Sequence, residues 1–193
     1  MRGCGRVRRL LGAGCLAVLL LSGCSSPRSH QMLVTEGSET SQRDAGYTLL
    51  VTLLEDEARV DGILILKTLP PPTRDLIKRI AEASRAGSRE LTRALAQPPV
   101  VSLENDGLPL IEAGARERIR QWTTMELLTE QGATLERALL VSQVQAVDTI
   151  RALASSLLDE ESTPSRVELL EQLRERFTPI RSELWDQLEA VVD

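Results

Sequence analysis

The sequence has 193 residues, of which 28 are acidic and 23 basic, and its formal net charge is −5. This length suits one domain of ordinary size with a sizeable core. The acidic balance argues against a nucleic-acid-binding protein, because such proteins bind through a basic surface. Aromatic residues make up only 2% of the chain, which argues against a stacking platform for bases or sugars.

The first 23 residues are typical of a signal peptide. Four arginines and no acidic residue accompany an apolar run from Leu10 to Leu21. A membrane-spanning helix needs about 20 apolar residues, so this run has the length of a signal-peptide core instead. We therefore expect residues 1–23 to be cleaved from the mature chain.

Residues 21–24, Leu-Ser-Gly-Cys, resemble the lipobox of bacterial lipoproteins. Small side chains at Ser22 and Gly23 suit a peptidase groove, and the thiol of Cys24 is nucleophilic enough to accept a lipid. The alternative is a chance cysteine at an ordinary cleavage site. The resemblance implies that Cys24 is acylated, palmitate being a typical chain, and that membrane lipid is a partner, since two or more acyl chains give stable anchoring.

The resemblance also implies a location in the cell envelope. In bacteria with two membranes, an aspartate directly after the lipidated cysteine favours retention at the inner membrane, whereas Ser25 occupies that position here. We therefore expect an outer-membrane anchor with the body in the periplasm. Cleavage would remove Cys4 and Cys15, so the mature chain could form no internal disulfide.

Residues 25–45 are rich in Ser, Thr, Gln and Gly and show little apolar periodicity. This composition is typical of a flexible linker. The sequence therefore predicts three parts: a signal peptide at 1–23, a lipidated cysteine with a flexible tether at 24–45, and a helical domain at 46–193.

From Gly46 onward the apolar residues recur with a helical period, and no segment shows the sustained alternation of a strand. Proline runs end the first two helices, and Thr73 and Thr163 are predicted as N-caps of the helices that follow them. The predicted helices cover residues 47–69, 73–96, 110–130, 133–159 and 164–191.

Several residues carry specific structural expectations. Ser84 and Gly87 lie on the inward row of their helix and are small enough for a neighbouring helix to approach closely. Pro179 lies inside the last helix and predicts a kink. Trp122 and Trp185 are expected at the edge of the core, with a ligand pocket as the alternative.

Long helices with broad apolar faces predict an all-α fold. The simplest arrangement is an antiparallel four-helix bundle, with the 110–130 helix as an extra helix on the long crossover connection.

Two segments, EQGATLERALLVSQVQAVDTIRALA at 130–154 and RFTPIRSELWDQL at 176–188, resemble a family of bacterial secreted ferritin-like proteins of unknown function. The resemblance implies two helices, a long link with a short helix, and two more helices. Family members commonly carry inward histidines, whereas the only histidine of this chain, His30, lies in the predicted tether. The sequence therefore assigns no metal ligands and no cofactor.

Glu57 lies on the same helical row as Leu53 and Val60 and could be an inward carboxylate. We expect it to face water at the edge of the domain instead, because an unpaired buried carboxylate is costly. The sequence shows no matching inward acid on the 133–159 helix.

The sequence contains no phosphate-binding glycine loop, no nucleophile elbow and no Cys–His pair. We therefore expect no catalytic residues and favour a membrane-anchored binding or scaffolding module with a protein partner in the envelope. One alternative is a ferritin-like metal-binding protein that uses carboxylates. Another is a small-molecule sensor with a crevice around Trp122.

Overall fold

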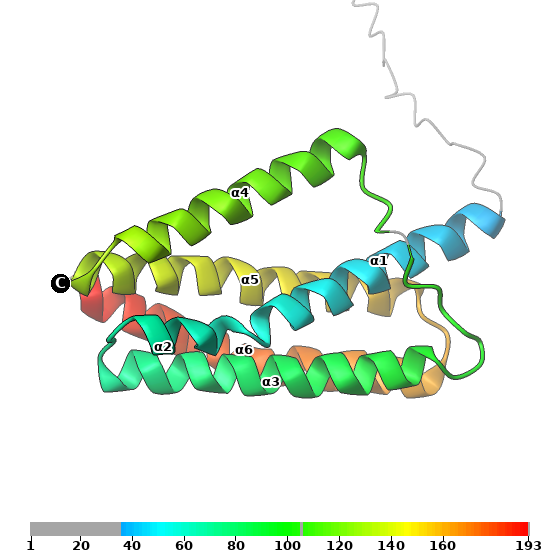
Figure 1. Ribbon diagram of the computed structural model, residues 1–193. Coiled ribbons are helices and arrows are strands. Elements are labelled where there is room, and N and C mark those ends of the chain that lie inside the picture. The colour runs from blue at the N-terminus through cyan, green and yellow to red at the C-terminus, as the bar shows by residue number, and fades with distance from the viewer. Residues whose placement is uncertain (1–35, 105, 193) are drawn as a thin grey trace, which may run out of the picture. The chain divides into compact units, whose positions relative to one another are not determined.

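The computed structural model describes residues 36–104 and 106–192, and every regular element within them is a helix (Figure 1). The all-α class is therefore confirmed for this part of the chain. Five long helices are accompanied by a short 3-10 helix η1 and a one-turn helix α2. In chain order the elements are α1 (Glu36–Glu57), η1 (Val60–Gly62), α2 (Ile63–Leu66), α3 (Pro71–Leu95), α4 (Leu110–Thr129), α5 (Gly132–Glu160) and α6 (Pro164–Val192).

The first helix begins about ten residues before its predicted start. Residues 36–45, expected to belong to a flexible tether, are the opening turns of α1. Composition predicted coil here, but tertiary contacts begin at the end of this stretch, where Asp44 accepts a hydrogen bond from the Ser102 amide at 3.4 Å. Directly after it, a Cβ added at Gly46 would lie 3.1 Å from Leu157 of α5, and Tyr47 is fully buried. Packing against α5 thus stabilises a helix that the amino-acid composition of this segment does not predict.

The first helix also ends earlier than predicted. The sequence indicated one helix to residue 69, whereas α1 stops at Glu57 and the chain turns through η1 and α2. Asp61 in η1 forms an ion pair with Arg85 of α3 at 2.6 Å, which holds the turn against that helix.

Thr73 is not the N-cap of α3, so that prediction is wrong. The helix starts at Pro71, and Pro70 occupies the capping position without a side-chain hydrogen bond. Proline suits the first helical turn, because its φ is preset and no amide hydrogen is needed there. The other predicted boundaries of α3, α4, α5 and α6 agree with the structure to within two residues.

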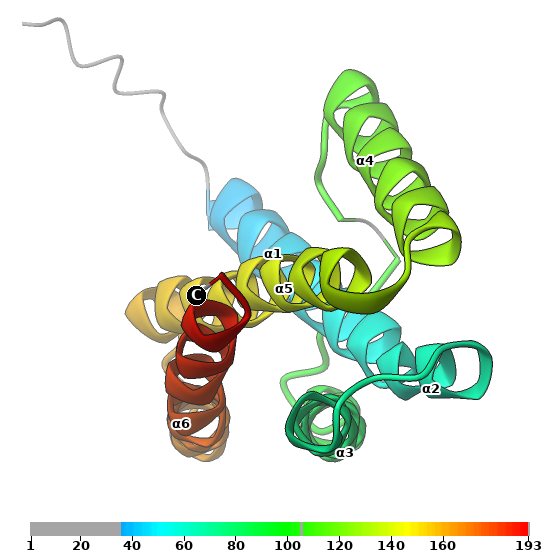
Figure 2. The ribbon, with the colours of Figure 1, turned by 90° about the vertical axis from the view of Figure 1, so that its left-hand side faces the viewer.

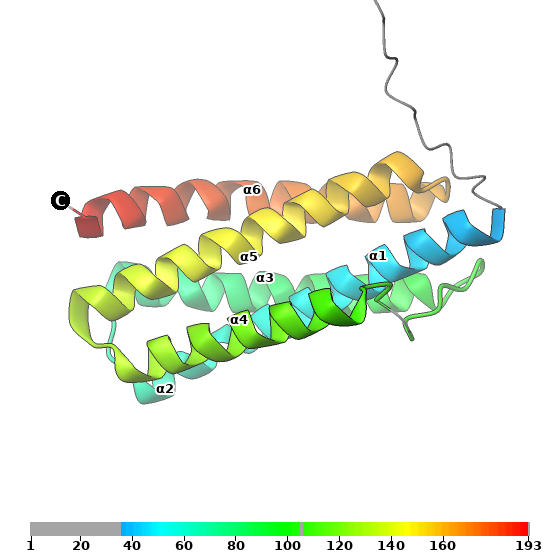
Figure 3. The ribbon, with the colours of Figure 1, turned by 90° about the horizontal axis from the view of Figure 1, so that it is seen from above.

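Four of the long helices enclose the core, and each packs against two of the others. The most extensive contact joins α5 to α6, which run in opposite directions; α1 packs on α3 and α5, and α3 packs on α6 (Figures 1 and 3). Leucine and isoleucine side chains from all four helices form one continuous cluster. In contrast, α4 packs mainly on α5 among the long helices, and the end-on view shows it outside the other four (Figure 2).

The predicted close approach at Gly87 is confirmed. A Cβ at this position would lie 2.7 Å from Leu173 Cδ1 of α6, closer than any real side chain could sit without a shift of its neighbour. Ser84, one turn earlier, is fully buried. The small residues of α3 therefore allow α6 to pack directly against the backbone.

Helix α6 continues through Pro179 without interruption. Proline removes the amide hydrogen that would bond the carbonyl of Glu175, but both residues are solvent-exposed. Water can satisfy that carbonyl, so the helix tolerates proline on its outer side. The bend at this residue stays a prediction.

Candidate functional site

Two residues singled out in the sequence, the expected lipidation site Cys24 and the lone His30, lie outside the described residues. Within the described part, no helix has the length and apolar content required to cross a bilayer.

Helix α4 carries more exposed large apolar side chains than any other helix of the described chain. None of its residues is buried. The exposed fraction is 88% for Ile111, 69% for Trp122 and 60% for Met125, and Leu110, Ile119 and Leu128 are exposed as well. Side chains of this kind on a soluble surface usually mark a place where something binds.

The apolar side of α4 is turned away from the domain. The partly buried residues that face the other helices are Ala113, Glu117, Thr123 and Leu127, and only the last of these is a large apolar side chain.

The opposite side of α4 carries its large exposed apolar residues. With 100° of rotation per residue, this side contains Ile111, Ala115, Trp122 and Met125. We call this side, together with Arg118, Ile119, Glu126 and Thr129, the outer face of α4. An amphipathic helix normally buries its apolar stripe, so this one lacks its partner in the described structure.

The prediction that both tryptophans lie at the edge of the core is wrong for Trp122 and only loosely met by Trp185. Trp122 lies on the outer face, and Trp185 of α6 is 39% exposed. The guanidinium of Arg181 lies 5.9 Å from the Trp185 ring centroid, within the range of a cation–π contact. Helical periodicity identifies the apolar side of a helix, but it does not show whether the rest of the domain covers that side.

Polar contacts hold α4 at its C-terminal half. Lys67 donates hydrogen bonds to the carbonyls of Leu128 at 2.7 Å and Glu130 at 2.9 Å, and so satisfies free carbonyls at the helix end. Arg120 pairs with Asp56 of α1 at 3.2 Å. These contacts fix the helix in place without burying its apolar side chains.

Most charged side chains of α4 are paired within the chain. Arg116 pairs with Glu112 at 2.9 Å, and Glu117 pairs with Arg120. The two exceptions are Arg118 and Glu126 on the outer face, which form no ion pair or side-chain hydrogen bond among the described residues.

Glu57 faces inward, so the expectation that it faces water is wrong. Its Oε2 is enclosed and has no hydrogen-bond partner among the described residues. Burial raises the pKa of Glu57 to about 7, against the opposing effect of a hydrogen bond from Gln143 of α5 and with a further rise due to Asp56. The Gln143 amide offsets only part of the cost of burying this carboxylate.

A second inward acid lies on α5, where the sequence indicated none. Glu136 is buried and accepts a hydrogen bond from the hydroxyl of Thr73, which is fully buried on α3. Each inward acid therefore has a neutral donor from another helix. Among the described residues, no three His, Cys, Asp or Glu side chains gather in a group suited to hold a metal ion.

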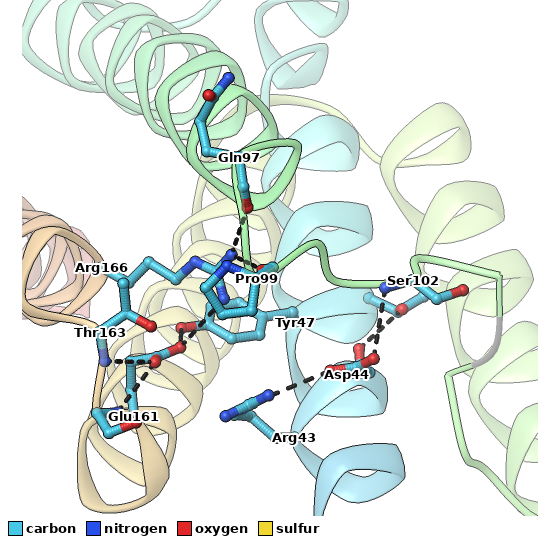
Figure 4. Close-up of polar contacts among 11 residues, drawn as sticks. Arg43, Asp44, Tyr47, Gln97, Pro99, Ser102, Glu161, Thr163 and Arg166 are labelled. Carbon is cyan, nitrogen blue, oxygen red and sulfur yellow. Dashed lines mark hydrogen bonds and ion pairs between the residues drawn. The ribbon is translucent and has the colours of Figure 1, made fainter.

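A buried polar cluster of Tyr47, Glu161 and Arg166 joins α1 to the connection between α5 and α6 (Figure 4). The Tyr47 hydroxyl donates to Glu161 Oε2 at 2.6 Å, and the backbone amides of Ser162 and Thr163 donate to Oε1 at 2.9 and 2.8 Å. The Arg166 guanidinium lies 3.7 Å from the same carboxylate.

Arg166 extends this cluster to the long crossover connection. Its guanidinium donates to the carbonyl of Gln97 at 3.0 Å and to that of Pro99. One buried cation thus ties the end of α3 to the start of α6 (Figure 4), which explains why a charged side chain is almost fully enclosed.

The pKa shifts within the cluster favour a structural role over a role in proton transfer. Burial and the bond to Glu161 raise the pKa of Tyr47, so the phenol stays a neutral donor. Burial would raise the pKa of Glu161, but the hydrogen bonds from Tyr47 and Thr163 and the nearby Arg43 lower it below its usual range. Sequence reasoning missed this cluster, because its three members are separated along the chain and none belongs to a recognisable motif.

Compared with protein-family models, curated sequences and solved structures, the chain matches none of them significantly.

Proposed function

We propose that the chain is a lipid-anchored cell-envelope protein that works by binding a protein partner through the outer face of α4. In this proposal Cys24 carries the lipid, the anchor lies in the outer membrane, and the helical domain faces the periplasm without a catalytic role. The fold proposed for the domain is an antiparallel four-helix bundle of ferritin-like order, formed by α1, α3, α5 and α6, with α4 on the crossover.

The single observation that carries the binding role is the orientation of α4. Its large apolar residues point away from the core, which costs solvation free energy that folding of this chain does not recover. A partner that covers them would recover it. The Tyr47–Glu161 and Thr73–Glu136 pairs and the bond from Arg166 to Gln97, in contrast, lie inside the domain and stabilise the helix packing.

The anchor is tested by replacing Cys24 with alanine in the full chain. We expect the unchanged protein to incorporate labelled fatty acid and the Cys24→Ala protein to incorporate none, because the substitution removes the thiol that accepts the lipid. Cys15→Ala is the matched control and should behave as wild type. An unacylated mature protein, detected by mass spectrometry, would refute the anchor.

The binding role is tested with a photo-crosslinkable residue in intact cells. We expect substitution of this residue at Ala115, on the outer face, to yield a discrete cross-linked protein band. The control places it at Ala152, an exposed position of α5. Equal yields from both positions, or adducts with lipid alone, would contradict the proposed binding face.

A carboxylate-based metal protein is the second candidate, favoured by the inward position of Glu57 and Glu136. Carboxylate oxygens suit manganese and iron, but two acids without histidine make a poor ligand set. Elemental analysis of the purified protein separates the candidates. Stoichiometric iron or manganese that is lost in Glu57→Gln would reverse our ranking.

A further inference from the structure

The outer face of α4 carries two opposite charges at equal distances along the helix from Trp122. Arg118 and Glu126 lie four residues before and four residues after Trp122, and they fall on either side of it around the helix axis. Both are exposed, and both lack a charged partner among the described residues, unlike the other arginines of this helix.

This arrangement is complementary to itself. If two such helices cross antiparallel on a two-fold axis at Trp122, Arg118 of one copy faces Glu126 of the other, and the reverse contact forms at the same time. The same operation places Ile119 opposite Met125 and Ala115 opposite Thr129. Apolar side chains then meet apolar or small ones, and the two unpaired charges find opposite charges.

We propose that the partner of the outer face of α4 is a second copy of this chain, bound in an antiparallel α4–α4 contact centred on Trp122. This inference rests on the proposed role of that face as a binding surface. An α4–α4 contact would account for three features: the outward apolar stripe, the exposed tryptophan, and the only two charges of α4 that are left unpaired within the described structure.

The chemistry of the face favours a second copy over a lipid surface. Glu126 lies beside Trp122 at the middle of the stripe, and the whole chain has a net charge of −5, which disfavours approach to anionic headgroups. Interfacial membrane helices instead carry an excess of Lys and Arg around their apolar side. The outer face has one charge of each sign.

The test uses charge reversal in the full chain, with two differently tagged copies made in the same cells and co-purified in mild detergent. We expect wild-type copies to co-purify. Arg118→Glu alone and Glu126→Arg alone should each reduce recovery of the second tag by roughly tenfold or more, because like charges then face each other twice.

Complementary pairs should restore association. A copy with Arg118→Glu mixed with a copy with Glu126→Arg regains both opposite-charge contacts, as does the double variant with itself. Arg89→Glu makes the same charge change on α3, away from the face, at an exposed residue that forms no ion pair among the described residues, and should leave recovery unchanged.

Several results would overturn the inference. Wild-type copies that do not co-purify, or reversals that do not rescue each other, exclude the antiparallel contact. Binding to phosphatidylglycerol vesicles that rises with Glu126→Arg and falls with Arg118→Glu would make the face a membrane surface. If Ala115 instead cross-links a different protein, self-association fails while the proposed binding role stands; if it cross-links no protein, both fail.

Discussion

At the scale of single residues, Glu57 has the clearest consequence for stability. Its pKa of about 7 in the folded chain is above the value of 4.5 for a free side chain. The folded state therefore binds a proton more tightly than the unfolded state. The stabilisation from this proton is fully present below about pH 4.5 and is lost as the pH rises through 7.

Replacing Glu57 with glutamine should remove this pH dependence. We expect Glu57→Gln to raise the free energy of unfolding at pH 8 by about 1–3 kcal/mol, with 1.4 kcal/mol per pKa unit as the basis, and to have little effect near pH 4.5. Urea denaturation at both pH values measures the difference. Glu55→Gln, an exposed neighbour on α1, is the control. An equal change at both pH values would show that burial of charge is not the cause.

Burial also explains why sequence reasoning misplaced this residue. The helical row correctly contained Glu57 together with apolar neighbours, but the general cost of burying a carboxylate argued for exposure. The offsetting amide of Gln143 lies 86 positions away in the sequence, on α5. A partner so distant becomes visible only when the helices are packed.

At the scale of helices, two glycines separate the effect of tertiary packing on stability from the effect of helix propensity. Gly87 of α3 faces Leu173 across a helix contact, whereas a Cβ at Gly114 of α4 would meet nothing within 4 Å. Both lie inside helices, where alanine is intrinsically better than glycine by about 1 kcal/mol.

We expect Gly114→Ala to be neutral or stabilising by up to about 1 kcal/mol, from helix propensity alone. Gly87→Ala should instead destabilise the domain by about 1–2 kcal/mol, because Leu173 must shift within a packed core. Chemical denaturation of the two variants gives the comparison. The close-packing account fails if Gly87→Ala stabilises the protein as much as Gly114→Ala does.

The helix boundaries show where sequence signals are strong. Proline runs and the Thr-Pro at 163–164 predicted the limits of α3 and α6 to within two residues, because proline acts on the local backbone whatever the rest of the chain does. The start of α1 and the turn after Glu57 were missed. Both depend on contacts with α3 and α5, which no local pattern reports.

At the scale of the whole molecule, α4 should be less stable than the rest of the domain. It has no buried residue and packs mainly on α5 among the long helices, so its opening exposes little apolar surface. In the Arg118→Glu chain, in which the proposed α4–α4 contact is disrupted, we expect hydrogen exchange to show the amides of α4 opening at a lower free energy than those of α3, α5 and α6.

Loss of the Lys67 contacts should loosen α4 selectively. In Lys67→Met we expect faster exchange in the last turn of α4, because the carbonyls of Leu128 and Glu130 lose their donor, and unchanged exchange in α3 and α6. Lys78→Met, at an exposed position of α3, is the control. Uniformly faster exchange throughout the domain would instead make α4 an integral part of the cooperative core.

Apolar periodicity and proline act locally, so the amino-acid sequence predicted the all-helical class, the number of long helices and most of their limits. It also contains the Leu-Ser-Gly-Cys pattern from which the anchor at Cys24 is proposed. Which apolar sides are covered depends on how the helices pack together. Helix packing buried the Tyr47–Glu161–Arg166 cluster and left Trp122 in water, because burial depends on what packs opposite a side chain and not on the period with which that side chain recurs.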